Sequence, residues 1–257
     1  MYINLLGVFY RVKIGFIILY KLVLCSSINK RKTLHLVNQL NNIGVGSVVI
    51  VLLTSCFMGM IFTFQVAREL TYLHAADLVG SILTVTFIRE LSPVLTAIIV
   101  TGRSGSAYTA EIAAMQVNNQ IDVLYVLHID PIEYLVKPRI IACALMLPLL
   151  NILSLATSIA SSIFIASVLY GIAPVTFVAS SSSSIYCIDL AYSLIKTLIF
   201  GLIIGVISCT WGLTTQGGSI SVGKSTTASV VTMLLVILVV DLILSLLMFY
   251  NAQSFIY

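Results

Sequence analysis

The sequence predicts an all-α integral membrane protein with five transmembrane helices, an N-terminal amphipathic interfacial helix and a short cytoplasmic helix. Of its 257 residues, 60% are apolar and 9% are charged, and mean hydropathy is +1.12. A typical soluble domain has about 25% charged residues. The 13 basic and nine acidic side chains are too few to cover the surface of a soluble fold of this size. A compact soluble enzyme is therefore excluded.

Residues 1–44 are predicted to form the interfacial region that precedes a five-span domain over 45–250 and a short tail over 251–257. Basic residues in the first 32 positions alternate with Ile, Leu, Phe and Tyr, which favours a membrane surface over a nucleic-acid partner. A cleaved signal peptide lacks such internal charges. We expect insertion where the chain is made, in a bacterial membrane or in an organelle that encodes it.

Four spans follow from apolar runs of about 20 residues, the length that crosses about 30 Å of hydrocarbon. The last two are interrupted by Lys196 and Asp241, respectively, and a loop with a serine run is expected over 170–184. The runs cover about residues 45–67, 140–169, 190–212 and 227–250.

The remaining apolar stretch, residues 76–114, is too long for a simple span, because as one helix it would measure about 58 Å. It either projects from the membrane or is broken. Pro93 lacks an N–H group to bond the carbonyl of Arg89, four residues earlier. A distortion is therefore expected beside Arg89 and Glu90.

Loop charges predict the topology of the five spans. Residues 1–46, 115–139 and 213–226 hold nine Lys or Arg residues, whereas the opposite side holds only Arg68. This bias places the N-terminus in the cytoplasm or stroma and the C-terminus on the far side. A sixth crossing would place basic loops on both sides of the membrane and so remove this bias.

Six charged residues lie within the predicted spans, and each would be costly without a partner, about 2.5–3.5 kcal/mol at the bilayer centre. Neighbours on a helix point about 100° apart, so Arg89 and Glu90 are expected to reach other helices or a cavity. Two interpretations stay open: a structural ion-pair network, or a polar pocket for a charged head group. The residues are Arg89, Glu90, Arg103, Glu111, Lys196 and Asp241.

The cytoplasmic segment 116–139 is predicted to form two short helices with a sharp turn between them. Four residues of the first share one face by their i, i+3, i+4, i+7 spacing: Ile121, Leu124, Tyr125 and His128. Asp130 is the expected N-cap of the second, with Pro131 at its first position. The segment is either an ordinary structured loop or a docking helix for a cytoplasmic partner.

Two motif matches are rejected on context, and no metal or other cofactor is expected. Residues 218–225 satisfy the P-loop pattern, but apolar spans flank them where a soluble strand is required. Residues 102–105 resemble a protease GxSG motif, but no histidine base is available on another span. The five cysteines are scattered and are read as apolar core residues.

Several further motifs resemble the MlaE-type permeases of lipid-transporting ABC systems, and the resemblance covers about residues 33–250. The departures touch the cytoplasmic segment, where Ala113-Ala114 replaces Gly-Thr, Val123 replaces Ala, and Leu127-His128 replaces Met-Gly. The matching motifs are Arg89 to Ala97, Gly102 to Ala107, Ala110 to Ile112, Gln120 to Asp122, Asp130-Pro131, Pro138-Arg139, Lys196 with Phe200-Gly201, Gly217-Gly218, Val222-Gly223 and Thr226-Thr227.

The resemblance implies a homodimeric permease, not itself an enzyme, driven by a separate cytoplasmic or stromal ATPase. It also implies an MCE-domain lipid-binding protein on the far side and phospholipid as cargo. Arg89, Glu90 and Lys196 would line the head-group cavity, with Arg103, Glu111 and Asp241 in an intramembrane charge network. An ATPase-coupling helix would comprise Gln120, Ile121, Asp122, Leu124 and Tyr125.

The composition of the chain resembles plastid-encoded algal members, so a chloroplast envelope membrane is expected, with a bacterial inner membrane as the alternative. Two rival functions stay open. One is a channel or ion-coupled carrier that uses the intramembrane carboxylates. The other is a purely structural membrane subunit.

Overall fold

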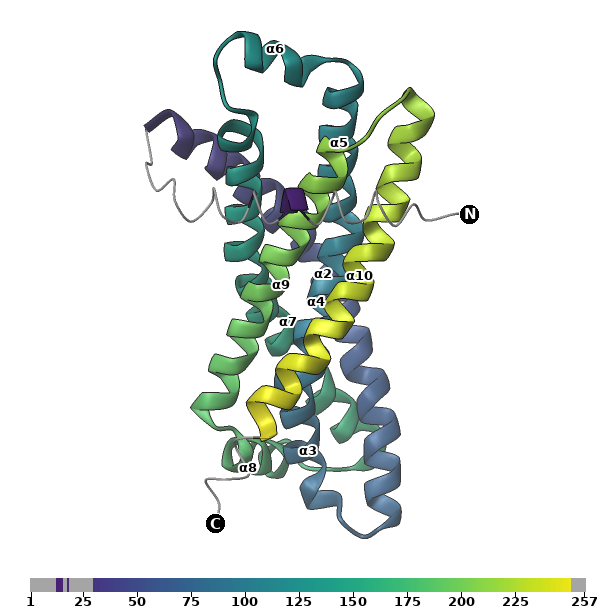
Figure 1. Cartoon of the computed structure of the whole chain (residues 1–257). Helices are drawn as coiled ribbons and strands as arrows, with labels where there is room; N and C mark the ends of the chain where they lie inside the picture. Colours follow the sequence, from purple (N-terminus) through teal and green to yellow (C-terminus); the bar gives the residue numbers. More distant parts are fainter. Residues whose placement is uncertain (1–12, 16–17, 19–29, 251–257) are drawn as a thin grey trace. The chain divides into compact units, whose positions relative to one another are not determined.

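The computed structural model describes residues 13–15, 18 and 30–250, and the regular elements of this part of the chain are all helices, joined by short turns (Figure 1). Five helical stretches are long and apolar enough to cross a membrane, as the sequence predicts. Most of the expected interfacial helix lies outside the described residues, but residues 30–44 form the first turns of α2. The candidate spans are Leu36–Tyr72, Ala76–Val117, Ile132–Tyr170, Cys187–Leu213 and Ser219–Met248.

The second span is continuous but contains two wide π-helical turns. It runs through η1 (Ala76–Leu78), α3 (Val79–Thr86), η2 (Phe87–Leu91), α4 (Ser92–Val100), η3 (Thr101–Gly105) and α5 (Ser106–Val117). The Ser92 N–H donates to the carbonyl of Phe87, five residues earlier. The distortion expected at Pro93 is therefore a π turn, which widens the helix beside Arg89 and Glu90 without breaking it.

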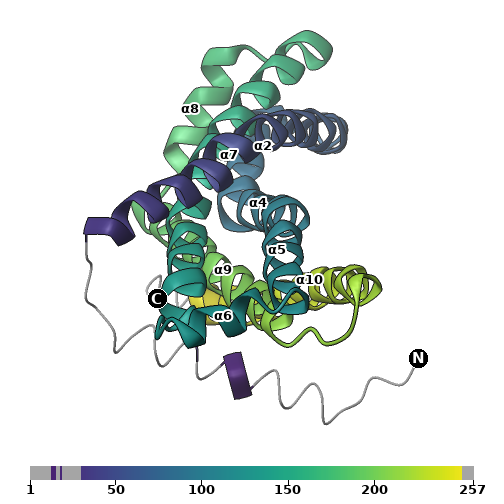
Figure 2. The same ribbon diagram turned by 90° about the horizontal axis from the view of Figure 1, so that it is seen from above.

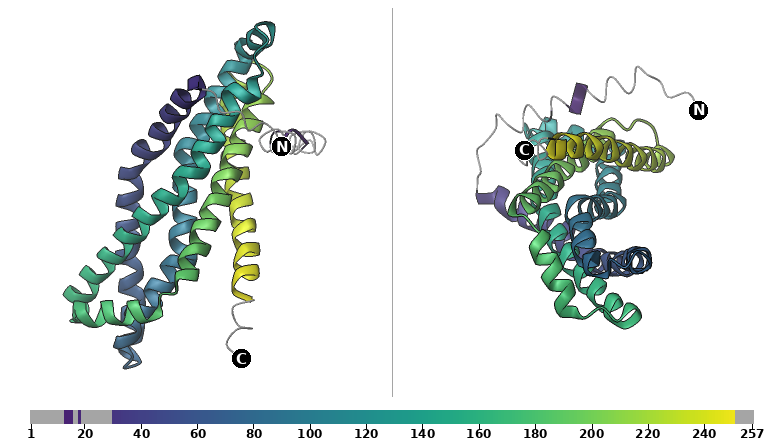
Figure 3. Two further views of the ribbon diagram at one scale, coloured as in Figure 1. Left: turned by 90° about the vertical axis from the view of Figure 1, so that its left-hand side faces the viewer. Right: turned by 90° about the horizontal axis from the view of Figure 1, so that it is seen from below.

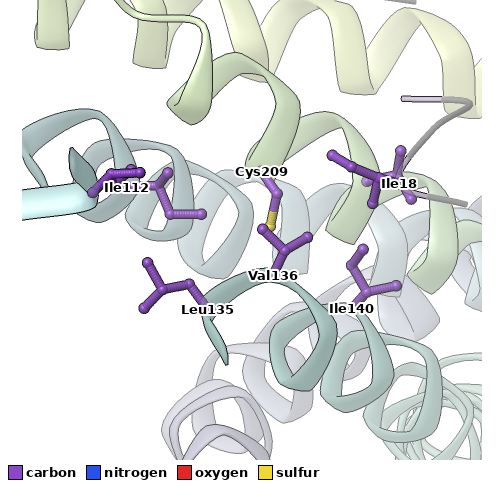
Figure 4. Close-up of a cluster of buried hydrophobic side chains, with 8 residues drawn as sticks. Ile18, Ile112, Leu135, Val136, Ile140 and Cys209 are labelled. Carbon is purple, nitrogen blue, oxygen red and sulfur yellow. The ribbon is translucent and has the colours of Figure 1, made fainter. Parts of the chain in front are cut away.

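The chain forms two compact units, and we describe each by itself. The first unit comprises Met1–Ser47, Val100–Met146 and Ile199–Val239. Its apolar core joins α5, η4 (Ile132–Val136), α7 (Lys137–Tyr170) and α9 (Cys187–Leu213). In Figure 4, Ile112, Val136 and Cys209 converge on this core from three of these elements.

The second unit comprises Val48–Ile99, Leu147–Leu198 and Val240–Tyr257. Here α2 (Lys30–Tyr72) runs beside α7 (Figure 2), and Ser158 Oγ donates to the carbonyl of Ser55 at 3.2 Å. Many hydroxyls in these helices bond back to their own helix, as Thr63 does to the Gly59 carbonyl at 2.7 Å. This bonding satisfies polar side chains inside apolar spans.

The loop predicted over 170–184 is wrong in part, because residues Pro174–Ser184 form the helix α8. Pro174 stands at its first turn, where its missing N–H costs nothing. Figures 1 and 3 show α8 lying across the long helices of the second unit. Close packing explains why it folds: a Cβ at Gly80 of α3 would stand 2.5 Å from the Phe177 carbonyl oxygen.

The last helix, α10, runs over Ser219–Tyr250 and begins eight residues earlier than predicted. The turn before it uses Gly217, whose φ of 112° is accessible to glycine. Gly223 and Lys224 are therefore helical. The P-loop pattern at 218–225 does not form a phosphate-binding loop.

Candidate functional site

Lys196 is the centre of a charged cluster in the second unit. Its side chain, on α9, is 1% exposed and its Nζ lies among four oxygen acceptors. Two are carboxylates, Glu90 Oε1 at 3.1 Å and Asp241 Oδ1 at 3.2 Å. The others are Ser245 Oγ at 2.8 Å and the backbone carbonyl of Arg89 at 2.9 Å. An ammonium group has three protons, so these acceptors fully occupy it.

The sequence explains why the Arg89 carbonyl needs a partner outside its own helix. Pro93 has no N–H, so this carbonyl loses its usual partner within the helix. Lys196 donates to it instead. The π turn η2, the proline and the lysine therefore act together: the distorted turn exposes an acceptor, and a cation from α9 satisfies it.

Arg89 leaves the same turn in a different direction from Glu90, as the helical geometry predicts. Its Nη2 contacts Asp189 Oδ2 at 3.2 Å, near the start of α9. The Arg89 side chain is 34% exposed and that of Glu90 is 42% exposed, whereas Asp189 is buried. The turn thus presents one cation and one carboxylate at the surface of the unit, and each is ion-paired with a residue of α9.

A buried set of neutral hydrogen bonds supports the cluster. Ser92, the residue after η2, donates to Asn151 Oδ1 of α7 at 2.7 Å. Asn151 Nδ2 donates to Ser193 Oγ of α9 at 2.9 Å. Ser193 lies one helical turn before Lys196. Asn151 thereby ties the π turn to the helix that carries the lysine.

The structure divides the six predicted intramembrane charges between the two units. Glu90, Lys196 and Asp241 meet directly in the second unit, with Arg89 on the same turn as Glu90. Arg103 and Glu111 belong to the first unit. Arg103 bonds neutral oxygens, and Glu111 pairs with Arg139 at 2.8 Å.

The ion-pair partners of Arg89 and Glu111 are not among the predicted site residues, because of where they lie in the sequence. Asp189 precedes the predicted fourth span by one residue, and Arg139 precedes the third by one residue, so hydropathy places both outside the spans. The structure buries both side chains against the charges they neutralise. The sequence feature that could have identified both residues is a single charge directly at the border of a predicted span.

The predicted cytoplasmic helix is α6 (Gln120–Val126), which follows α5 in the first unit (Figure 1). Ile121 is buried, and Leu124 packs against the same core. The assignment of His128 to this helical face is wrong, because α6 ends at Val126 and His128 has a φ of 57°. As predicted, Asp130 caps the next turn: its Oδ1 accepts the Ile132 N–H at 3.0 Å.

Five candidate spans define a multi-pass membrane protein, and a charged cluster inside the spans is typical of transporters. Residues 36–247 match the model of the family described as Permease MlaE, so the chain belongs to the MlaE permease family. An ABC permease of this kind is not itself an enzyme and pairs with an ATPase subunit.

Relatives of the chain have the same class. A probable ABC transporter permease protein, ycf63, of Pyropia yezoensis is 48% identical over 88% of this chain and 86% of its own length. A probable ABC transporter permease protein of Synechocystis is 49% identical over 88% and 85%. The chloroplastic protein TRIGALACTOSYLDIACYLGLYCEROL 1 of Arabidopsis thaliana is 44% identical over 90% of this chain and 65% of its own length.

Proposed function

We propose that this chain, as a homodimer, moves phospholipid between membranes, driven by a separate ATPase on the cytoplasmic or stromal side. Membership of the MlaE permease family supports the proposal, and so does the lipid in the name of the Arabidopsis relative. An MCE-domain lipid-binding protein is the proposed partner on the far side. A plastid envelope membrane is the proposed location, since that relative is chloroplastic; a bacterial inner membrane is the alternative.

The observation that carries the proposal is the paired exposure of Arg89 and Glu90 on one π turn inside a candidate span. Both side chains are ion-paired, yet each keeps an exposed part, and charge exposed within a span is stabilised by water or a polar ligand. Arg89 is suited to the lipid phosphate, because a guanidinium forms paired hydrogen bonds with phosphate oxygens. Lys196, buried and fully bonded, positions Glu90 and the turn.

The charge balance of the cluster restricts the head group. Arg89 and Lys196 are outnumbered by Glu90, Asp189 and Asp241, so a bare phosphate meets an excess of carboxylate. A head group that also carries an amine or hydroxyl donor satisfies both signs. Arg89 then binds its phosphate, and Glu90 accepts a hydrogen bond from its amine or hydroxyl.

We assign ATPase coupling to α6. Ile121 and Leu124 anchor it to the apolar core of the first unit. Val123 and Tyr125 are exposed on the same short helix. Exposed apolar side chains on a rigid, anchored helix are suited to docking in a groove of a partner. Gln120 and Asp122 supply polar contacts at its start.

The test is transport of labelled phospholipid between vesicles by the chain reconstituted with its co-purifying ATPase. We expect Arg89→Gln and Glu90→Gln to lower transport at least tenfold. The control Arg68→Gln, which removes an exposed positive charge elsewhere as Arg89→Gln does within the site, should leave transport unchanged. Tyr125→Ala should instead leave an ATPase rate that no longer responds to added phospholipid. Ion flux or transport by the chain alone, without ATPase, would overturn the proposal in favour of an ion-coupled carrier.

A further inference from the structure

The first unit contains a cavity of about 420 Å³, separate from the Lys196 cluster. It lies between α2 and the η3–α5 stretch, and its size falls within the range of sites for small ligands. Asn41 and Asn42 line it with polar groups from α2. Arg103 and Glu111 line it from the other helix, and Ile43 and Val45 add apolar surface.

Arg103 is the exposed cation of this cavity. Its Nη1 donates to Ser47 Oγ at 2.8 Å and contacts the Asn42 carbonyl at 3.5 Å, and both partners are neutral. Its guanidinium packs closely against Gly46 of α2, where a Cβ would stand 2.4 Å from Nη2. Within the described residues, Arg103 has no acidic partner.

The carboxylate on the same wall as Arg103 is already neutralised. Glu111 Oε2 accepts a hydrogen bond from Arg139 Nη2 at 2.8 Å. The Arg139 guanidinium is buried, 5.2 Å from the centre of the Tyr108 ring. Its Nε and Nη1 have no hydrogen-bond partner in the described part of the chain. Because Arg139 neutralises Glu111 from behind, the Arg103 guanidinium gives the cavity lining a net positive charge, which favours an anion.

The position of the cavity along its helices matches the level of lipid head groups. The span Leu36–Tyr72 has 37 residues, about 55 Å at 1.5 Å per residue, and so exceeds a 30 Å hydrocarbon core by about 13 Å at each end. Asn41 and Gly46 lie about 8 and 15 Å from the start of that span. The cavity therefore lies near the border between hydrocarbon and head groups.

From these observations we propose that the cavity binds the phosphate group of a phospholipid from the leaflet on the side of the N-terminus. Arg103 binds the phosphate, the amides of Asn41 and Asn42 donate further hydrogen bonds, and an acyl chain lies along Ile43 and Val45. This second lipid site requires binding alone and does not depend on transport through the Lys196 cluster.

The test uses the full chain, purified in a neutral detergent, with native mass spectrometry to count bound lipid. The probes are phosphatidylglycerol, phosphatidylcholine and a neutral glycosyl diacylglycerol. A phosphatidylglycerol with a photoreactive head group maps the site by peptide analysis. We expect both phospholipids to bind, and one set of crosslinks to fall in residues 36–47 and 101–117, apart from those at the Arg89–Glu90 turn. A surplus of inorganic phosphate that displaces the lipid would instead identify free phosphate as the ligand and overturn the proposal.

Arg103→Gln should weaken phospholipid binding about tenfold, the loss expected for a charge-assisted hydrogen bond. Gly46→Ala, which displaces the guanidinium without removing its charge, should also weaken it, whereas Arg68→Gln and Glu90→Gln should keep the crosslinks. Unchanged crosslinks in both Arg103→Gln and Gly46→Ala, or equal binding of the neutral glycolipid, would overturn the proposal. Because Glu90→Gln tests the other site, failure of transport and failure of this inference are distinguishable.

Discussion

Replacement of Lys196 by methionine tests whether the charged cluster holds the second unit together. Methionine has a similar length and no charge, so it fills the space of the lysine stem but removes all four contacts of Nζ. Glu90 and Asp241 then face each other without the cation between them, and the Arg89 carbonyl loses its donor. The variant thus leaves two like charges and an unsatisfied backbone acceptor inside a span.

The expected loss follows from burial. Removing one member of a buried ion pair costs about 3–5 kcal/mol. Lys196 and Asp241 are largely buried, but the half-exposed Glu90 can be solvated, so we expect the lower end, about 3 kcal/mol. For a chain of this length, 1 kcal/mol shifts Tm by about 2–4 °C, which gives a fall of about 6–12 °C.

The assay is thermal unfolding of the detergent-purified chain, followed with a thiol-reactive fluorescent dye. Cys143 and Cys209 are free and buried, so they react when the fold opens and add to the baseline signal of the exposed Cys187 and the half-buried Cys56. Lys224→Met, which removes an exposed lysine from α10, is the matched control and should leave Tm unchanged. Adding Asp241→Asn to Lys196→Met should restore part of the loss. Equal Tm values for Lys196→Met and Lys224→Met would refute the reasoning.

Further substitutions test the packing around the site by the same melting assay. Gly80→Ala places a Cβ 2.5 Å from the Phe177 carbonyl oxygen and should lower the stability of the chain by about 1–3 kcal/mol. The control Gly223→Ala adds a Cβ in open space and should not destabilise the chain. Equal stability of the two variants would contradict close packing of α3 against α8. Asn151→Ala removes the amide that joins the buried Ser92 and Ser193 hydroxyls and leaves Ser92 only its weaker contacts with the residue 151 carbonyl and Ser154 Oγ. It should cost about 1–3 kcal/mol, while the exposed Asn38→Ala serves as its control. If Asn151 positions the turn, its loss should also lower phospholipid transport, and normal transport by a stable Asn151→Ala chain would refute that role.

The sequence determined the number of spans and where the charges inside them fall, because both depend on local composition. In lipid, the backbone N–H and C=O groups of a single apolar run must be hydrogen-bonded within the run, which requires a helix. Hydropathy therefore predicts these helices directly. The missing N–H of Pro93 likewise predicts a distortion at a definite carbonyl. The sequence does not predict the helix α8, because serine-rich segments have weak helix propensity. The stability of α8 comes from its contact with α3.

The tertiary structure decided which charge meets which. Arg89 and Glu90 are adjacent in sequence yet have different partners, Asp189 and Lys196, both supplied by a helix 100 residues away. Charge type and span position restrict such pairings but cannot choose among them, since several opposite charges lie within reach of any one helix face. Only the packing of α4, α7 and α9, fixed by Ser92, Asn151 and Ser193, selects the pairs.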